Sequence, residues 1–218
     1  MPPLSKKAPA RKQARKTAAS AIAATKSKLK KLLASKNLES EDFSGITLLR
    51  KSLWKVRFGR ADLSETEITE CAMIFCDLTR AKLTDAKISE TALIFCRLNQ
   101  ANLQGTTLHG CFVMGCSFLD ARLDRAKVSS SQFMLNNFRG ALLTRSKFTK
   151  TVTSFNNFYD ADLTASSLKD SILAFSNLVR TRTRAMKTEH SLLQLNVGDA
   201  IAELFSRSRE VFASRILR

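Results

Sequence analysis

The chain has 218 residues, of which 36 are Lys or Arg and 19 are Asp or Glu, so its formal net charge is +17 and its pI is near 10.1. No apolar stretch approaches the roughly 18–20 residues that a membrane-spanning helix needs, and the first residues lack the apolar core of a secretory signal. The five cysteines are too few and odd in number for a disulfide scaffold. We therefore expect reduced thiols in a cytosol-like compartment.

Residues 1–40 form a basic arm rich in Ala, Lys and Ser, with 11 Lys or Arg and a single acid, Glu39. Such a run is either a solvated tail, a segment that meets an anionic surface, or a transit peptide. Within it, residues 19–35 place apolar side chains on one face of a short amphipathic helix. The candidate contacts to an anionic partner in this arm are Lys6, Lys7, Arg11, Lys12, Arg15 and Lys16.

Residues 41–180 carry an internal repeat with a period of five. From Phe43 to Leu178 every fifth residue is large and apolar, with Thr153 as the one interruption, and the residue two positions earlier is small or compact from Ala61 onward. Neither a helix nor a flat strand has this period, so the chain must turn once in each pentapeptide. A second period of twenty residues indicates that four such turns complete one coil.

The repeats ADLSE (61–65), ANLQG (101–105) and ADLTA (161–165) resemble the A(D/N)LxX pattern of the pentapeptide-repeat family. The resemblance implies an all-β fold, a right-handed quadrilateral β-helix of about seven coils, in which the central apolar residue and the small residue point inward. Stacked coils at about 4.8 Å would share ladder hydrogen bonds and a common core. Asn136 and Asn156 fall on inward positions, where two stacked amides can satisfy each other.

The five cysteines all fall on the inward small-residue position, which favours buried core thiols over the zinc site that the Cys-x4-Cys spacings suggest. Neither His109 nor His190 has the neighbours of a catalytic triad, and no phosphate-binding or dinucleotide motif is present. We therefore expect no enzymatic activity, no catalytic residues, no metal and no cofactor.

In the third pentapeptide of each coil, the two residues that follow the core residue should point outward. Most of these residues are apolar along the repeat. An apolar stripe in an outward position predicts that something covers it. The residues of this candidate interface stripe are Ile74, Phe75, Ile94, Phe95, Met114, Met134, Leu135, Phe155 and Phe175.

A band of basic residues lies in the later coils, since residues 121–160 carry seven bases and two acids, whereas residues 61–100 carry four bases and seven acids. The band is suited to phosphate contact, although solvated surface is the alternative. Its candidate contacts to an anionic partner are Arg122, Arg125, Lys127, Arg145 and Lys147.

Residues 181–218 are predicted to form a C-terminal helical cap and a possible dimerisation element. Apolar residues between 189 and 217 have helix-compatible spacing, and Gly198-Asp199 is a plausible break between two helices. The stripe would be covered either by one of the chain's own helices or by a partner, which includes a second copy.

These features predict a non-catalytic scaffold that presents faces of the repeat to a macromolecule, with a protein as the expected partner. The basic arm would add contact to nucleic acid or an anionic membrane surface. Quinolone-resistance members of the family bind gyrase with acidic surfaces, and the positive charge here argues against that role. We expect a bacterial cytoplasmic protein, with a secreted effector that engages a host protein or membrane as the alternative, or a protein that associates with nucleic acid or topoisomerase.

Overall fold

The computed structural model describes residues 27–32 and 34–197. The chain divides into two units, residues 1–36 and residues 37–218. In the first unit, residues 27–32 and 34 are helical, within the helix predicted for residues 19–35. The other residues of that predicted helix lie outside the described part of the chain.

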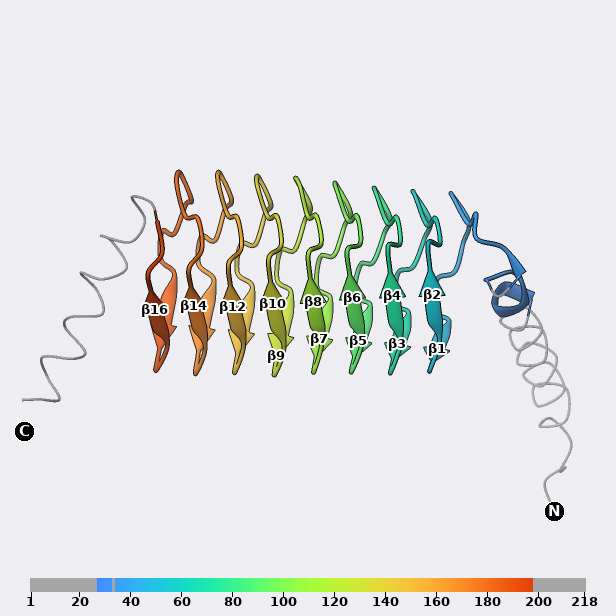
Figure 1. Ribbon diagram of the computed structural model, residues 1–218, viewed down its shortest axis with the longest axis horizontal. Helices are drawn as coiled ribbons and strands as arrows, with labels where there is room; N and C mark the ends of the chain where they lie inside the picture. Colours follow the sequence, from blue (N-terminus) through green and yellow to red (C-terminus); the bar gives the residue numbers. More distant parts are fainter. Residues whose placement is uncertain (1–26, 33, 198–218) are drawn as a thin grey trace, which may run out of the picture. The chain divides into compact units, whose positions relative to one another are not determined.

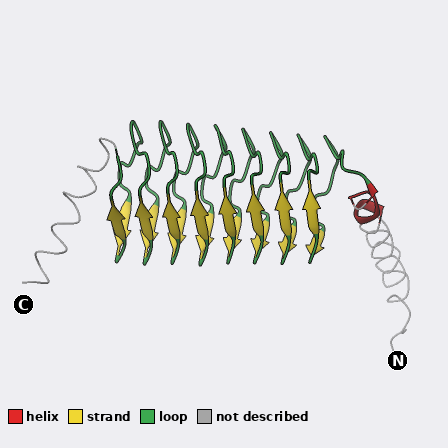
Figure 2. Ribbon diagram, in the orientation of Figure 1, coloured by secondary structure: helices red, strands yellow, loops and turns green. Residues whose placement is uncertain are grey.

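In the second unit, residues 37–197 form a parallel β-solenoid (Figure 1). Two faces of each coil carry three-residue strands, drawn in yellow in Figure 2. The other two faces are joined between coils by single β-bridges. Strands in the same sheet are 20 residues apart, so Met73 pairs in register with Leu93 and Leu93 pairs with Val113. The all-β solenoid predicted from the five-residue period is thus confirmed.

Each sheet contains eight parallel strands. The first sheet consists of β1 (Thr47–Leu49), β3 (Glu67–Thr69), β5 (Lys87–Ser89), β7 (Thr107–His109), β9 (Lys127–Ser129), β11 (Lys147–Thr149), β13 (Ser167–Lys169) and β15 (Lys187–Glu189). The second sheet consists of β2 (Ser52–Trp54), β4 (Ala72–Ile74), β6 (Ala92–Ile94), β8 (Phe112–Met114), β10 (Gln132–Met134), β12 (Val152–Ser154), β14 (Ile172–Ala174) and β16 (Leu192–Gln194).

The core is a set of columns, because the central residue of each pentapeptide points inward above its equivalent in the next coil. Phe118, Phe138 and Phe158 stack with ring centroids 4.6 and 5.0 Å apart. Small residues fill the inner corners, and Ala61, Ala81 and the equivalent residues are fully buried. Burial in the stack, rather than within any single coil, therefore holds the solenoid together.

Asn136 and Asn156 form the predicted inward amide ladder. The Asn136 backbone N–H and its Nδ2 both donate to Asn156 Oδ1, at 2.8 and 3.0 Å. Asn156 Nδ2 in turn donates to the carbonyl of Phe133 at 2.9 Å. The ladder satisfies polar groups that burial would otherwise leave unpaired.

Both predicted boundaries of the repeat were wrong. At the N-terminal end the coils begin before residue 41, since Leu38 is fully buried and its N–H donates to the carbonyl of Arg57 at 2.8 Å. At the other end, residues 187–189 and 192–194 are strands instead of the predicted helical cap.

The C-terminal coil forms because the edge of the preceding coil offers open backbone groups. The N–H of Leu192 donates to the carbonyl of Ser171 at 2.9 Å, and Asn196 Oδ1 accepts from the N–H of Ser176 at 2.8 Å. Ladder pairing thus continues although Thr183 and Thr188 replace large apolar residues at two core positions of this coil. The rest of the predicted cap and dimerisation element, residues 198–218, lies outside the described residues.

Candidate functional site

One face of the solenoid is apolar along its length. The second sheet turns its first and third strand residues outward, and the residue after each strand occupies the adjoining corner. We call these outward residues, from β4 to β16 with their following corners, the apolar face. No Asp, Glu, Lys or Arg occurs among them, although one residue in four of the whole chain is charged. The stripe predicted from the sequence lies on this face.

The corner residues of the apolar face project most. They have a left-handed backbone, with φ between 50° and 57° in Phe75, Phe95, Leu135, Phe155 and Phe175. Their side chains are 46–60 % exposed. The strand residues of the predicted stripe (Ile74, Ile94, Met114 and Met134) are half-buried between neighbouring coils.

The corner rings stack in two pairs separated by a gap. Phe75 and Phe95 lie with their centroids 5.4 Å apart and nearly parallel, and Phe155 and Phe175 lie 4.9 Å apart. Between the pairs the corner row passes through Gly115 and then Leu135. A Cβ at Gly115 would lie 2.5 Å from two ring carbons of Phe95, so the ring lies over this glycine.

Sequence reasoning missed the outward residue that precedes each core position on the same strands. Phe112 and Val152 are half-buried there, while Ile172 and Leu192 are 37 and 50 % exposed. The alternation of a three-residue strand would have identified them, because residues on either side of an inward residue both point outward. Leu195, 65 % exposed, extends the corner row into the coil that was predicted to be helical.

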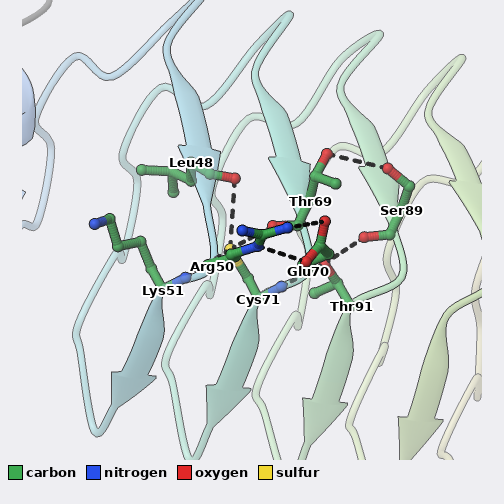
Figure 3. Close-up of polar contacts among 8 residues, drawn as sticks. All are labelled: Leu48, Arg50, Lys51, Thr69, Glu70, Cys71, Ser89 and Thr91. Carbon is green, nitrogen blue, oxygen red and sulfur yellow. Dashed lines mark hydrogen bonds and ion pairs between the residues drawn. The ribbon is translucent and has the colours of Figure 1, made fainter.

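The other faces are polar, and their side chains pair between coils because residues 20 apart share a register. At the corner before the apolar face, Arg50 Nε donates to Glu70 Oε2 at 2.7 Å (Figure 3). One position earlier, the hydroxyls of Thr69 and Ser89 lie 3.1 Å apart, also drawn in Figure 3. Such exposed pairs contribute little to stability, and they keep those faces hydrated.

Four cations form an unpaired cluster on one ridge. Lys127 and Lys147 are paired in register on β9 and β11, and Arg125 and Arg145 occupy the corner just before these strands. No ion pair involves any of these four side chains within residues 27–32 and 34–197. We call these four residues the basic ridge.

The remaining candidate anion contacts are placed differently. Arg122 lies 3.5 Å from Asp124 across the same pentapeptide, so its charge is partly neutralised. The six arm residues, Lys6, Lys7, Arg11, Lys12, Arg15 and Lys16, lie outside the described residues.

The five thiols are buried in the core, as their repeat position predicts. Burial raises the pKa of Cys111 to about 11. A hydrogen bond with Cys116, together with burial, raises the pKa of Cys96 to about 12. Cys96 and Cys111 are therefore protonated and shielded at neutral pH.

In the described part of the chain, no group of three or more His, Cys, Asp or Glu side chains is placed to hold a metal ion. His109 Nδ1 lies 2.9 Å from the Ser129 hydroxyl, and its Nε2 lies 3.9 Å from Glu90. Across the same residues, no helix is long and apolar enough to span a membrane.

The family model for pentapeptide repeats, in eight copies, matches residues 52–85, 76–113 and 96–133. A search of curated proteins found no match. Among solved structures, a trypsin-treated QnrB1, described as a plasmid-mediated fluoroquinolone resistance protein, is 18 % identical and has a TM-score of 0.64, covering 79 % of this chain and 95 % of that chain.

HetL, a pentapeptide repeat protein involved in heterocyst differentiation regulation in the cyanobacterium Nostoc sp. strain PCC 7120, is also 18 % identical. It covers 75 % of this chain and 90 % of that chain, with a TM-score of 0.28. At these identities a structural likeness indicates a shared fold and no more, and only the likeness to QnrB1 is close enough to do so. Residues 52–133 of the chain therefore consist of pentapeptide repeats, and the observed coils share the fold of QnrB1.

Proposed function

We propose that the protein is a non-catalytic scaffold whose apolar face binds a protein. The observation that supports this most is the occupancy of the left-handed corners. A left-handed backbone is unfavourable for residues with a Cβ, and Asn, Asp and Gly tolerate it best. The corners of the other faces hold Asp at positions 85, 120, 160 and 170, but they also hold many Arg, Lys and Glu residues at similar φ, so polarity is what most of these corners share. On the apolar face the same geometry holds Phe or Leu, which gain little from a half-exposed position.

The size of the face is consistent with docking. From β4 to β16 the strands span six intervals of about 4.8 Å, and three strand residues extend about 10 Å, so the flat projection is roughly 300 Å². The projecting rings add to the accessible area. This area, which is apolar except for Gln132, Ser154 and Gln194, lies at the lower end of the range of the largest apolar patches on typical monomers, and such patches are often functional.

A comparison of protein capture by three forms of the full chain tests this proposal. Phe155→Asp introduces a charge at an exposed corner whose backbone suits Asp. Leu142→Asp is the matched control, because Leu142 is exposed on the opposite face and pairs in register with Asp162. We expect Phe155→Asp to lose proteins that the wild type and Leu142→Asp both retain, with unchanged circular dichroism. Equal capture by all three folded forms would contradict the proposal.

A second function, contact with an anionic macromolecule, is favoured by the basic ridge. Two Arg and two Lys side chains are displayed on adjacent coils without an acidic partner in the described residues. Such a cluster gives salt-dependent affinity for phosphate groups and little sequence discrimination. Because the ridge borders the side of the solenoid opposite the apolar face, both surfaces could be occupied together.

A further inference from the structure

We propose that the apolar face binds a second copy of this chain, in an antiparallel two-fold arrangement whose axis crosses the face between β8 and β10. This inference rests on the proposed function, since it names the partner of the same face. Two rods that meet face to face about such an axis place β4 opposite β14, β6 opposite β12, and β8 opposite β10. A contact of this kind is isologous, so every pairing occurs twice.

The corner row has the symmetry that this arrangement needs. Phe75 and Phe95 precede the centre and Phe155 and Phe175 follow it, with Gly115 and Leu135 between the two pairs. The two-fold axis therefore places one ring pair of each copy against the other ring pair of its partner. Leu135, the most exposed residue of the predicted stripe, meets the low point of the partner's row, where the Phe95 ring lies over Gly115.

The strand residues are complementary in size about the same centre. The outward residues that follow the core position decrease in size along the rod, from Ile74 and Ile94 to Ser154 and Ala174. The antiparallel arrangement faces Ile74 with Ala174 and Ile94 with Ser154. The outward residues that precede the core position increase in size along the rod, from Ala92 to Val152. The antiparallel arrangement faces Ala92 with Val152, so a small side chain again lies opposite a larger one.

The sizes of the strand residues alone would also permit two rods that lie parallel. The residues at the two corner rows beside the apolar face exclude this parallel arrangement. In a parallel pair the row of corner rings would face the opposite corner row of the partner. That row holds Glu70, Glu90 and Asp170, so carboxylates would be placed against Phe rings. In the antiparallel pair, rings face rings and the polar row faces itself.

Charge in the antiparallel pair is complementary at one pairing of the polar corner row and repulsive at another, because the two-fold also places Glu70 opposite Asp170. Along the polar corner row, Glu90 and Lys150 lie three coils apart on opposite sides of the axis, and the two-fold places Glu90 of each copy opposite Lys150 of the other. Lys150 has no ion pair within the described residues. Residues 61–100 have four bases and seven acids, whereas residues 141–180, which would lie opposite, have five bases and three acids.

The area that the two copies would bury determines the affinity that we expect for the dimer. With roughly 400–500 Å² buried on each copy, the contact lies below the usual size of a stable interface and in the range of weak, transient association. We expect dissociation constants in the tens to hundreds of micromolar. Sedimentation velocity of the full chain from about 1 to 500 µM in moderate salt covers this range.

The wild type should show a reversible monomer–dimer equilibrium. Leu135→Asp should weaken it at least tenfold, and Leu142→Asp should leave it unchanged. Glu90→Lys or Lys150→Glu alone should weaken it about three- to tenfold, and the double variant should restore it to within about twofold, since the exchanged charges again attract.

Cross-linking tests the orientation directly. Because the five native thiols are buried, Glu90→Cys and Lys150→Cys variants would each carry one exposed thiol. A short bismaleimide should link the two variants when they are mixed and should link neither variant to itself. Self-linked products without the mixed product would overturn the antiparallel arrangement.

A chain that stays monomeric to 500 µM, or a dimer that Leu135→Asp does not weaken, would overturn the proposal. Protein capture that is lost on Phe155→Asp in a monomeric chain would leave the proposed function intact and reject only the second copy as the occupant. If the variants change neither self-association nor capture, both proposals fail.

Discussion

Replacement of Asn156 by Ala should reveal how much the buried amide ladder contributes to stability. Asn156 is 2 % exposed and uses its whole side chain. Its Oδ1 accepts from the N–H and Nδ2 of Asn136, and its Nδ2 donates to the carbonyls of Phe133 and Ser154 at 2.9 and 3.0 Å. Removal of the amide leaves the Asn136 N–H without its acceptor, whereas Asn136 Nδ2 keeps the carbonyl of Val113 and the Ser154 carbonyl keeps the N–H of Leu135.

A buried polar group without a partner costs about 1–3 kcal/mol. The Asn136 N–H loses its acceptor and three further hydrogen bonds of the amide are lost, so we expect Asn156→Ala to lower the free energy of unfolding by about 2–4 kcal/mol. Asn156→Ser should cost less, about 1–3 kcal/mol, since a serine hydroxyl at the equivalent inward corner, Ser131, accepts from the N–H of Cys111 at 3.0 Å.

Urea unfolding followed by circular dichroism, in reducing buffer, measures these differences, provided that the slope with denaturant is the same in each variant. Asn157→Ala is the matched control. Asn157 also belongs to an amide ladder, with Asn137 and Asn177, but on the outer surface, where water replaces the lost bonds. A loss below about 1 kcal/mol for Asn156→Ala, or an equal loss for Asn157→Ala, would refute the reasoning.

Three further predictions concern the core, the thiols and the ridge. Thr183→Val should raise the free energy of unfolding by about 1 kcal/mol in urea titrations, because the Thr183 hydroxyl is buried without a hydrogen bond to the described residues; a loss of stability would contradict this. Burial raises the pKa of Cys111 to about 11 from an ordinary value of 9.0, so the folded state holds the proton more tightly than the unfolded state. Its contribution, roughly 2–3 kcal/mol, should be present below pH 9 and decline as the pH rises toward 11, and Cys111→Ala should flatten this part of the stability–pH curve. Replacement of all four basic-ridge residues by Ser should reduce the slope of log K against log salt by about three to four for duplex DNA if the ridge contacts phosphates; an unchanged slope would remove the ridge from any such contact.

The fold could be predicted from the sequence because the five-residue period is a consequence of geometry. A side chain of one kind must recur each time the chain turns a corner, and the period of twenty fixes which residues stack. The inward positions of Cys96 and Asn156 follow from that count alone. The residues of the stripe could be placed on one face by the same count.

The ends of the repeat could not be predicted in this way. In residues 181–197 the large core residues give way to Thr183 and Thr188, and Leu192, Leu193 and Leu195 also fit a helix. The deciding factor is the open ladder of the preceding coil, which pairs with any extended backbone. The stripe predicted from the sequence includes only residues that follow a core position, and Phe112 and Val152 directly precede one.

The left-handed backbone conformation of the corner residues has no pattern in the sequence that would predict it. The left-handed φ of Phe95 and Leu135 becomes visible only in the structure, where these side chains are 49 and 60 % exposed. Most corners of the other faces hold polar residues or Gly, and this difference supports the proposed docking surface.

The free energy of unfolding of the Phe95→Asp/Phe155→Asp double variant, measured at about 1 µM beside its self-association at high concentration, tests the docking surface most directly. The variant gives up two ring stacks of about 0.5–1.5 kcal/mol each and gains a residue better suited to the corner. We expect it to stay folded, within about 2 kcal/mol of the wild type, while self-association weakens at least tenfold. A loss of 4 kcal/mol or more, or unchanged association, would show that the rings serve the fold and would contradict the account.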